Sequence, residues 1–134
     1  MDSKPALSAS AFFTKETAET GVRVPLYLPN GEKTNEWLHL IGTDSEAFRV
    51  AAVGINQRFL GEAGKPLTPE EQAKQREEKN LLVAAAAITA WSFAEPCDEK
   101  HKVHVLRNAP ALFELVNRFS GNRANFFTPP AKAS

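Results

Sequence analysis

VRVPLYLPNGEKTNEWLHLI, at residues 22–41, decides the fold, because it joins two alternating segments through a turn. Four aliphatic side chains of the first segment fall on one face: Val22, Val24, Leu26 and Leu28. This two-residue period is typical of a half-buried β-strand. Pro25 has no N–H to donate to a neighbouring strand, so we expect the strand at a sheet edge. Asn30 and Gly31 both tolerate positive φ and favour a hairpin turn.

The second strand is expected from about Glu36 to Ile41, and it carries apolar groups on both faces. One face holds Trp37, His39 and Ile41, and the other holds Leu38 and Leu40. A strand with one solvated face would instead alternate between apolar and polar residues. We therefore expect this strand to be covered by helices.

Two helices are predicted after the hairpin. The first spans residues 43–60, because Thr43 and Glu46 have the spacing of a capping box at its start. The second spans residues 68–93, because Thr68 suits the N-cap and a proline follows it. The first half of this second helix is almost wholly polar and its second half almost wholly apolar. We therefore expect it to run from solvent into the core.

The C-terminal third of the chain is less regular. Residues 97–107 suit either a short helix or a strand, and the helix is favoured. Pro110 suits the first turn of a further helix, with Asn108 as its cap. Gly121 suits the end of that helix.

With 134 residues, the chain has the length of one domain. These patterns predict an α+β fold, in which an N-terminal β-hairpin packs on a mainly α-helical domain of three to four helices. We divide the chain into a flexible N-terminal arm, a single α+β domain and a C-terminal tail, at residues 1–21, 22–121 and 122–134.

Charge and composition exclude several classes of protein. Lys+Arg and Asp+Glu both total 16, which argues against a dedicated nucleic-acid-binding protein. The longest apolar run, residues 81–93, is shorter than the roughly 20 residues that span a bilayer. Cys97 is the only cysteine, so an intramolecular disulfide is impossible. Residues 1–10 lack the pattern of a secretory signal, and we expect a cytoplasmic protein that binds neither membrane nor nucleic acid.

Catalytic and metal-binding motifs are sparse. The sequence contains no phosphate-binding glycine loop, nucleophile elbow or helical zinc-binding pair. Cys97, His101 and His104 lie close together, and Asp98 or Glu99 could add an oxygen ligand. A structural zinc site usually needs four ligands, so two solvated histidines beside a buried thiol are the better interpretation. Cys97 as a nucleophile would need one of these histidines as a positioned base. The sequence therefore predicts a protein that is not an enzyme and that holds no cofactor or metal.

Two phenylalanine pairs stand near the ends of the chain. Phe12 and Phe13 lie in the arm, and Phe126 and Phe127 lie in the tail. Exposed apolar groups of this kind mark interaction sites, so these four residues are the candidate partner-binding residues. The equally favoured alternative is that each pair folds back and closes the core, as ordered terminal segments usually do.

Four segments, taken in order, carry a resemblance to a known family. They are VPLYLPNG at residues 24–31, GTDSEAFR at residues 42–49, the apolar stretch at residues 81–93, and NAPAL through RANF at residues 108–126. Their order and spacing over residues 20–127 resemble the tail assembly chaperones of long-tailed bacteriophages.

The resemblance implies a role in the infected bacterial cell. Such chaperones bind the very long, helical tape measure protein and keep it soluble until tail tube subunits polymerise around it. They are absent from the finished virion, and many are also made in a longer, frameshifted form. The implied partners are the tape measure protein and the tail tube protein, with self-association compatible with the neutral net charge.

Two alternatives remain open from the sequence. The first is a structural head–tail connector or tail completion protein, which would stay in the virion. The second is a small metal-binding regulatory domain built on Cys97, His101 and His104.

Overall fold

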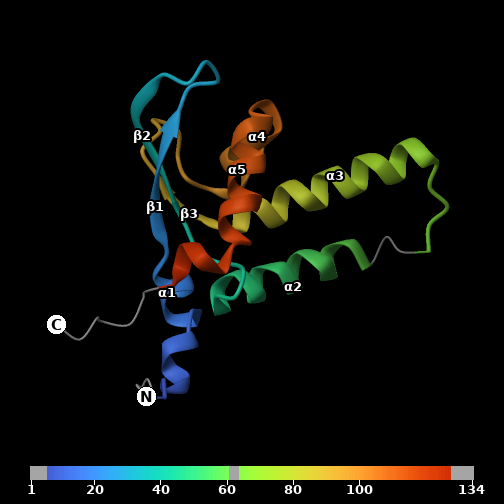
Figure 1. Cartoon of the computed structure of the whole chain (residues 1–134). Helices are drawn as coiled ribbons and strands as arrows, with labels where there is room; N and C mark the ends of the chain where they lie inside the picture. The colour runs from blue at the N-terminus through green and yellow to red at the C-terminus, as the bar shows by residue number, and fades with distance from the viewer. Residues whose placement is uncertain (1–5, 61–63, 128–134) are drawn as a thin grey trace.

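The computed structural model describes residues 6–60 and 64–127 of the chain (Figure 1). Strands β1 (Val22–Tyr27) and β2 (Lys33–Leu40) form the expected antiparallel hairpin, with Val24 opposite Leu38. Gly31 in the connecting turn has a φ of 90°, a conformation that glycine adopts without steric cost. The α+β fold with an N-terminal hairpin is therefore confirmed.

A third strand occupies a segment where a helix was predicted. Helix α3 (Pro69–Ala86) ends early, and β3 (Ile88–Trp91) then pairs antiparallel with β2, placing Trp91 opposite Leu38. The predicted helix to residue 93 is therefore wrong in its last turns. A segment that is apolar on every side can form a buried helix or a buried strand, so its pattern does not distinguish the two. The β-branched and aromatic side chains after Ala87 favour the strand, and pairing with β2 stabilises it.

The sheet order is β1-β2-β3, so β2 is the central strand. Leu38 and Leu40 are buried on the face that packs against helices. On the other face Trp37 is only part-buried, and the Arg23 guanidinium lies 3.9 Å from its ring centroid. In the described part of the chain, helices cover one face of β2 rather than both, and on the second face Arg23 stacks on the Trp37 ring.

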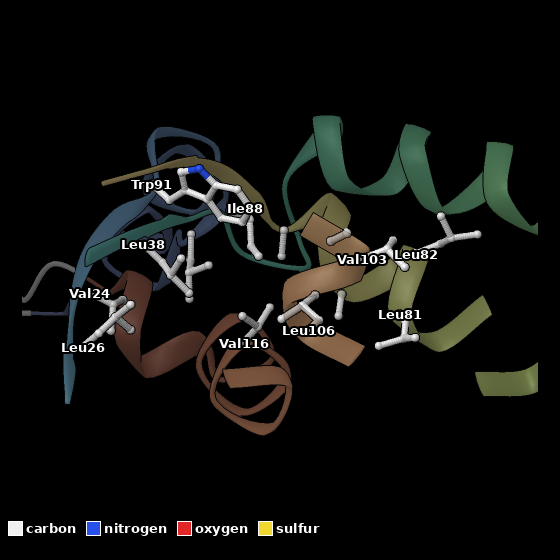
Figure 2. Packing of buried hydrophobic residues seen from close by; sticks show 14 of the residues in the cluster. Val24, Leu26, Leu38, Leu81, Leu82, Ile88, Trp91, Val103, Leu106 and Val116 are labelled. Carbon is white, nitrogen blue, oxygen red and sulfur yellow. The ribbon is translucent and has the colours of Figure 1, made fainter. Parts of the chain in front are cut away.

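Four longer helices complete the domain. Helix α2 (Glu46–Leu60) and α3 form an antiparallel pair that projects from the sheet (Figure 1). Helices α4 (Glu99–Asn108) and α5 (Pro110–Ser120) lie beside the sheet. The helix favoured for residues 97–107 is confirmed as α4. The buried cluster shown in Figure 2 runs from the sheet to the second half of α3. Six elements contribute the following members of this cluster: Leu26, Leu38, Leu82, Ile88, Trp91, Leu106 and Val116.

The helix starts show where the capping predictions hold. Thr68 caps α3 as expected, because its Oγ1 accepts a hydrogen bond from the Glu71 backbone N–H at 3.1 Å. The box predicted at Thr43 is wrong. The buried Ser45 hydroxyl instead accepts the Phe48 N–H at 3.2 Å, one turn into α2. Asn108 does not cap α5. It is the last residue of α4, and its side-chain amide donates to the His104 carbonyl at 2.8 Å.

Short helices are present in the terminal segments. The arm contains a 3₁₀ turn, η1 (Ala9–Phe12), and the helix α1 (Lys15–Thr20). The tail begins with a second 3₁₀ turn, η2 (Arg123–Phe126). Ala18 of α1 and Phe126 of η2 are both buried, so parts of the arm and the tail belong to the folded core.

Candidate functional site

Both terminal segments meet at Gly42, directly after the sheet. The Gly42 N–H donates to the Ala18 carbonyl at 2.9 Å, which fixes α1 against the end of β2. A Cβ at residue 42 would lie 2.8 Å from the Ala18 Cβ and 3.2 Å from the Phe126 ring. Only glycine lets α1 and η2 approach this closely. We name this region, formed by α1, η2 and Gly42, the terminal junction.

An ion pair holds the tail side of the terminal junction. The Arg123 guanidinium binds the Asp44 carboxylate through two hydrogen bonds of 2.6 and 3.1 Å. This bidentate geometry is the strongest form of the Arg–carboxylate pair. The hydrogen bond from Arg123 lowers the pKa of Asp44 below its ordinary value, although partial burial opposes the change.

Acid should weaken this link. The lowered pKa of Asp44 contributes stability that is fully present above the unfolded-state pKa of about 3.9 and is lost as the pH falls through the folded-state pKa. We expect Asp44→Asn to lower the free energy of unfolding by about 1 kcal/mol or less at pH 7, as for other surface pairs. Thermal melts of both proteins between pH 7 and pH 2 measure this. An equally large difference at pH 2 would contradict the assignment.

Charged contacts orient the arm side of the terminal junction. The Glu46 carboxylate lies 3.7 Å from the Lys15 ammonium, and the Glu46 backbone N–H donates to the Glu19 carboxylate at 3.2 Å. Exposed pairs of this kind contribute little stability. They connect α1 to the first turn of α2.

The four candidate phenylalanines differ in how far they are exposed to solvent. Phe12 and Phe13 remain 72% and 69% exposed, and Phe127 is 40% exposed. Phe126 is only 2% exposed, and its ring packs edge-on against Phe119 at a centroid distance of 5.7 Å. Phe126 therefore closes the core, and the apolar surface is provided by Phe12, Phe13 and Phe127. We call these three residues the terminal surface.

A groove lies next to the terminal surface. Its volume is about 710 Å³. Its lining combines one aromatic side chain, one hydroxyl and charges of both signs, and it comes from the arm and the start of α2: Phe13, Thr14, Lys15, Glu16, Glu19, Asp44 and Arg49. An apolar side chain flanked by charges of both signs suits a polypeptide partner that binds reversibly.

A second apolar surface lies at the far end of the hairpin, and the sequence did not indicate it. Tyr27 and Leu28 are about half exposed there, at the edge of a groove of about 680 Å³ that reaches the start of α5. Leu28 directly follows β1 and continues its alternating apolar pattern, so the pattern alone predicts that it is buried. The groove lies between the hairpin and the start of α5.

The metal-binding alternative is not supported by the arrangement around α4. Within residues 6–60 and 64–127, no three His, Cys, Asp or Glu side chains converge on a position that could hold a metal ion. Asp98 caps α4 instead, accepting the His101 backbone N–H at 2.9 Å and lying 2.6 Å from the His101 Nδ1. Burial raises the pKa of the Cys97 thiol, which reduces its thiolate fraction at neutral pH.

Within residues 6–60 and 64–127, no helix has both the length and the apolar character that crossing a membrane requires. The chain has no significant match among protein-family models, curated proteins or solved structures.

Proposed function

We propose that this chain is a phage tail assembly chaperone, which binds the tape measure protein and keeps it soluble while the tail tube assembles. The observation that carries the proposal is the pair of phenylalanines in the arm, Phe12 and Phe13, which are 72% and 69% exposed at the end of the 3₁₀ turn η1. Large apolar side chains that a folded protein leaves exposed to solvent often mark a protein-binding site. The resemblance over residues 20–127 supplies the class of client.

The form of the terminal surface suits a client that must later be released. The two phenylalanines of the arm give a small apolar contact, and the groove that Phe13 lines adds charges of both signs. A contact of this size is weak by itself, and several copies along one long client would hold it through avidity. Release then requires only that tube subunits displace the copies one after another.

The proposal places the chain in the cytoplasm of the infected bacterium. The tape measure protein is its client there, and the tail tube protein replaces the chain on that client. Mass spectrometry of purified virions tests the proposed place of action. We expect the chain to be missing from mature particles that contain the tape measure protein. A stoichiometric amount in those particles would favour a connector or tail completion subunit instead.

Matched variants test the terminal surface. We expect Phe12→Ser with Phe13→Ser to abolish most of the client solubility that the unmodified chain confers, because each removes an exposed aromatic contact. The matched control is Tyr27→Ser with Leu28→Ser, two exposed apolar residues at the opposite end of the molecule, which should leave the soluble fraction unchanged. The client fraction in the supernatant after co-expression is the measurement. Equal solubility with all three chains would contradict this assignment of the surface.

A further inference from the structure

The face of the sheet that none of the described helices covers carries three directly opposed residue pairs. They join β1 to β2: Arg23 with His39, Pro25 with Trp37, and Tyr27 with Lys33. Directly opposite residues of an antiparallel pair lie on the same face. Val24 and Leu26 alternate with the β1 members of these pairs and are buried under the helices, so the six residues lie on the other face. We call the six residues the open face.

No acid of the sheet balances the positive charge of the open face. The strands β1, β2 and β3 contain one acid, Glu36. Its carboxylate accepts the Ser92 hydroxyl at 2.6 Å, and Glu36 lines the groove between the hairpin and α5, on the helix side of the sheet. Glu32, in the hairpin turn, accepts the Asn30 side-chain amide at 2.9 Å. The two acids of α1 line the groove beside the terminal surface.

The Arg23 guanidinium is held in place by the ring beneath it. It lies 3.9 Å from the Trp37 ring centroid. Stacking uses the flat side of a guanidinium and leaves its N–H edges available for a carboxylate. Within residues 6–60 and 64–127, neither the Arg23 guanidinium nor the Lys33 ammonium makes a hydrogen bond or an ion pair. The open face therefore offers two cations without acidic partners, one of them already oriented.

We propose that the open face binds an extended, acidic segment of a partner protein. One carboxylate pairs with Arg23 through two hydrogen bonds, and a second pairs with Lys33. Tyr27, opposite Lys33, is four residues from Arg23, so the two cations start about 13 Å apart along the strand. An extended segment has the same rise, so acids four residues apart match this distance. The residue midway between them points to the same side and contacts Pro25 and Trp37.

A single-stranded nucleic acid fits the open face less well. Such ligands bind by stacking their bases on exposed rings. The Arg23 guanidinium already covers Trp37, which leaves Tyr27 as the other ring of the open face. The net charge of zero adds no wider attraction to a phosphate backbone. The acidic segment does not rest on the proposed function, because it contacts none of the phenylalanines of the terminal surface.

An NMR titration of the isotope-labelled full chain tests the proposal. The probe is a synthetic peptide with blocked ends, two glutamates four residues apart and a valine midway between them. We expect saturable shifts of the Arg23 side-chain N–H and the Trp37 indole N–H, and we expect salt to weaken binding because it screens both charge pairs. The same peptide with glutamines in place of both glutamates should cause no shift.

Matched variants assign the binding to the open face. Arg23→Gln should weaken peptide binding by about tenfold or more, the loss expected when the charged partner of a hydrogen-bonded carboxylate is removed. Lys33→Gln should weaken it less, because lysine forms no bidentate pair. The control is Arg76→Gln, at an exposed arginine of α3, which should bind the peptide like the unmodified chain. All three side chains are exposed, so each variant should keep its fold, which circular dichroism checks.

Three results would overturn the proposal. The first is that the acidic peptide causes no saturable shift on the open face at concentrations up to the millimolar range. The second is that Arg23→Gln and Arg76→Gln bind the peptide equally well. The third is that a single strand of eight thymidines binds the open face more tightly than the peptide, which would assign this face to nucleic acid.

Discussion

Replacing Phe126 with alanine is expected to lower the free energy of unfolding by about 3–5 kcal/mol, the range for truncating a buried aromatic side chain. The ring is 2% exposed, and it packs against Phe119 and over Gly42. Its loss would leave a cavity where the tail and the arm both meet the sheet. We expect thermal melting by circular dichroism to show a decrease of about 10 °C or more.

The neighbouring Phe127 provides the matched control. It is 40% exposed, so Phe127→Ala should cost about 1 kcal/mol or less, a loss typical of surface substitutions. The two variants remove the same ring from adjacent positions, and only the burial of that ring differs. Equal losses of stability would contradict the placement of Phe126 in the core.

The second large effect is expected at β2, where adjacent residues lie on opposite faces of the sheet. Leu38 is 1% exposed and faces the helices, so Leu38→Ala should cost about 2–5 kcal/mol. Trp37 lies on the face that Arg23 covers, and Trp37→Ala should cost no more than about 2 kcal/mol despite removing a larger side chain. Chemical denaturation of both variants gives the two values.

The order of these two losses is the informative result. A helix on each face of β2 would make the tryptophan the costlier residue to truncate, because it is much larger than leucine. If helices cover only the face that carries Leu38, truncating Leu38 costs more stability than truncating Trp37. A loss at Trp37 that exceeds the loss at Leu38 would therefore contradict the one-sided packing.

The elements that the sequence predicted correctly are those with a local signal. The hairpin follows from the two-residue period and the Asn30-Gly31 turn, and the start of α3 follows from Thr68. Strand β3 was missed because its identity depends on pairing with β2, about 50 residues earlier in the chain. An apolar segment has no period of its own by which to choose between helix and strand.

The candidate surface was predictable only in part. Composition singles out two phenylalanine pairs, but it cannot show that Phe126 is buried while Phe127 is exposed. That difference arises at the terminal junction, where Arg123 reaches Asp44 across 79 positions of the chain.

We propose that this chain keeps the tape measure protein soluble, and co-expression of the two proteins tests this proposal most directly. The measurement is the fraction of tape measure protein left in the supernatant after centrifugation, with the chain and with an empty vector. We predict that most of the client is soluble with the chain and that most of it sediments without it. The same soluble fraction in both cases would contradict the claim.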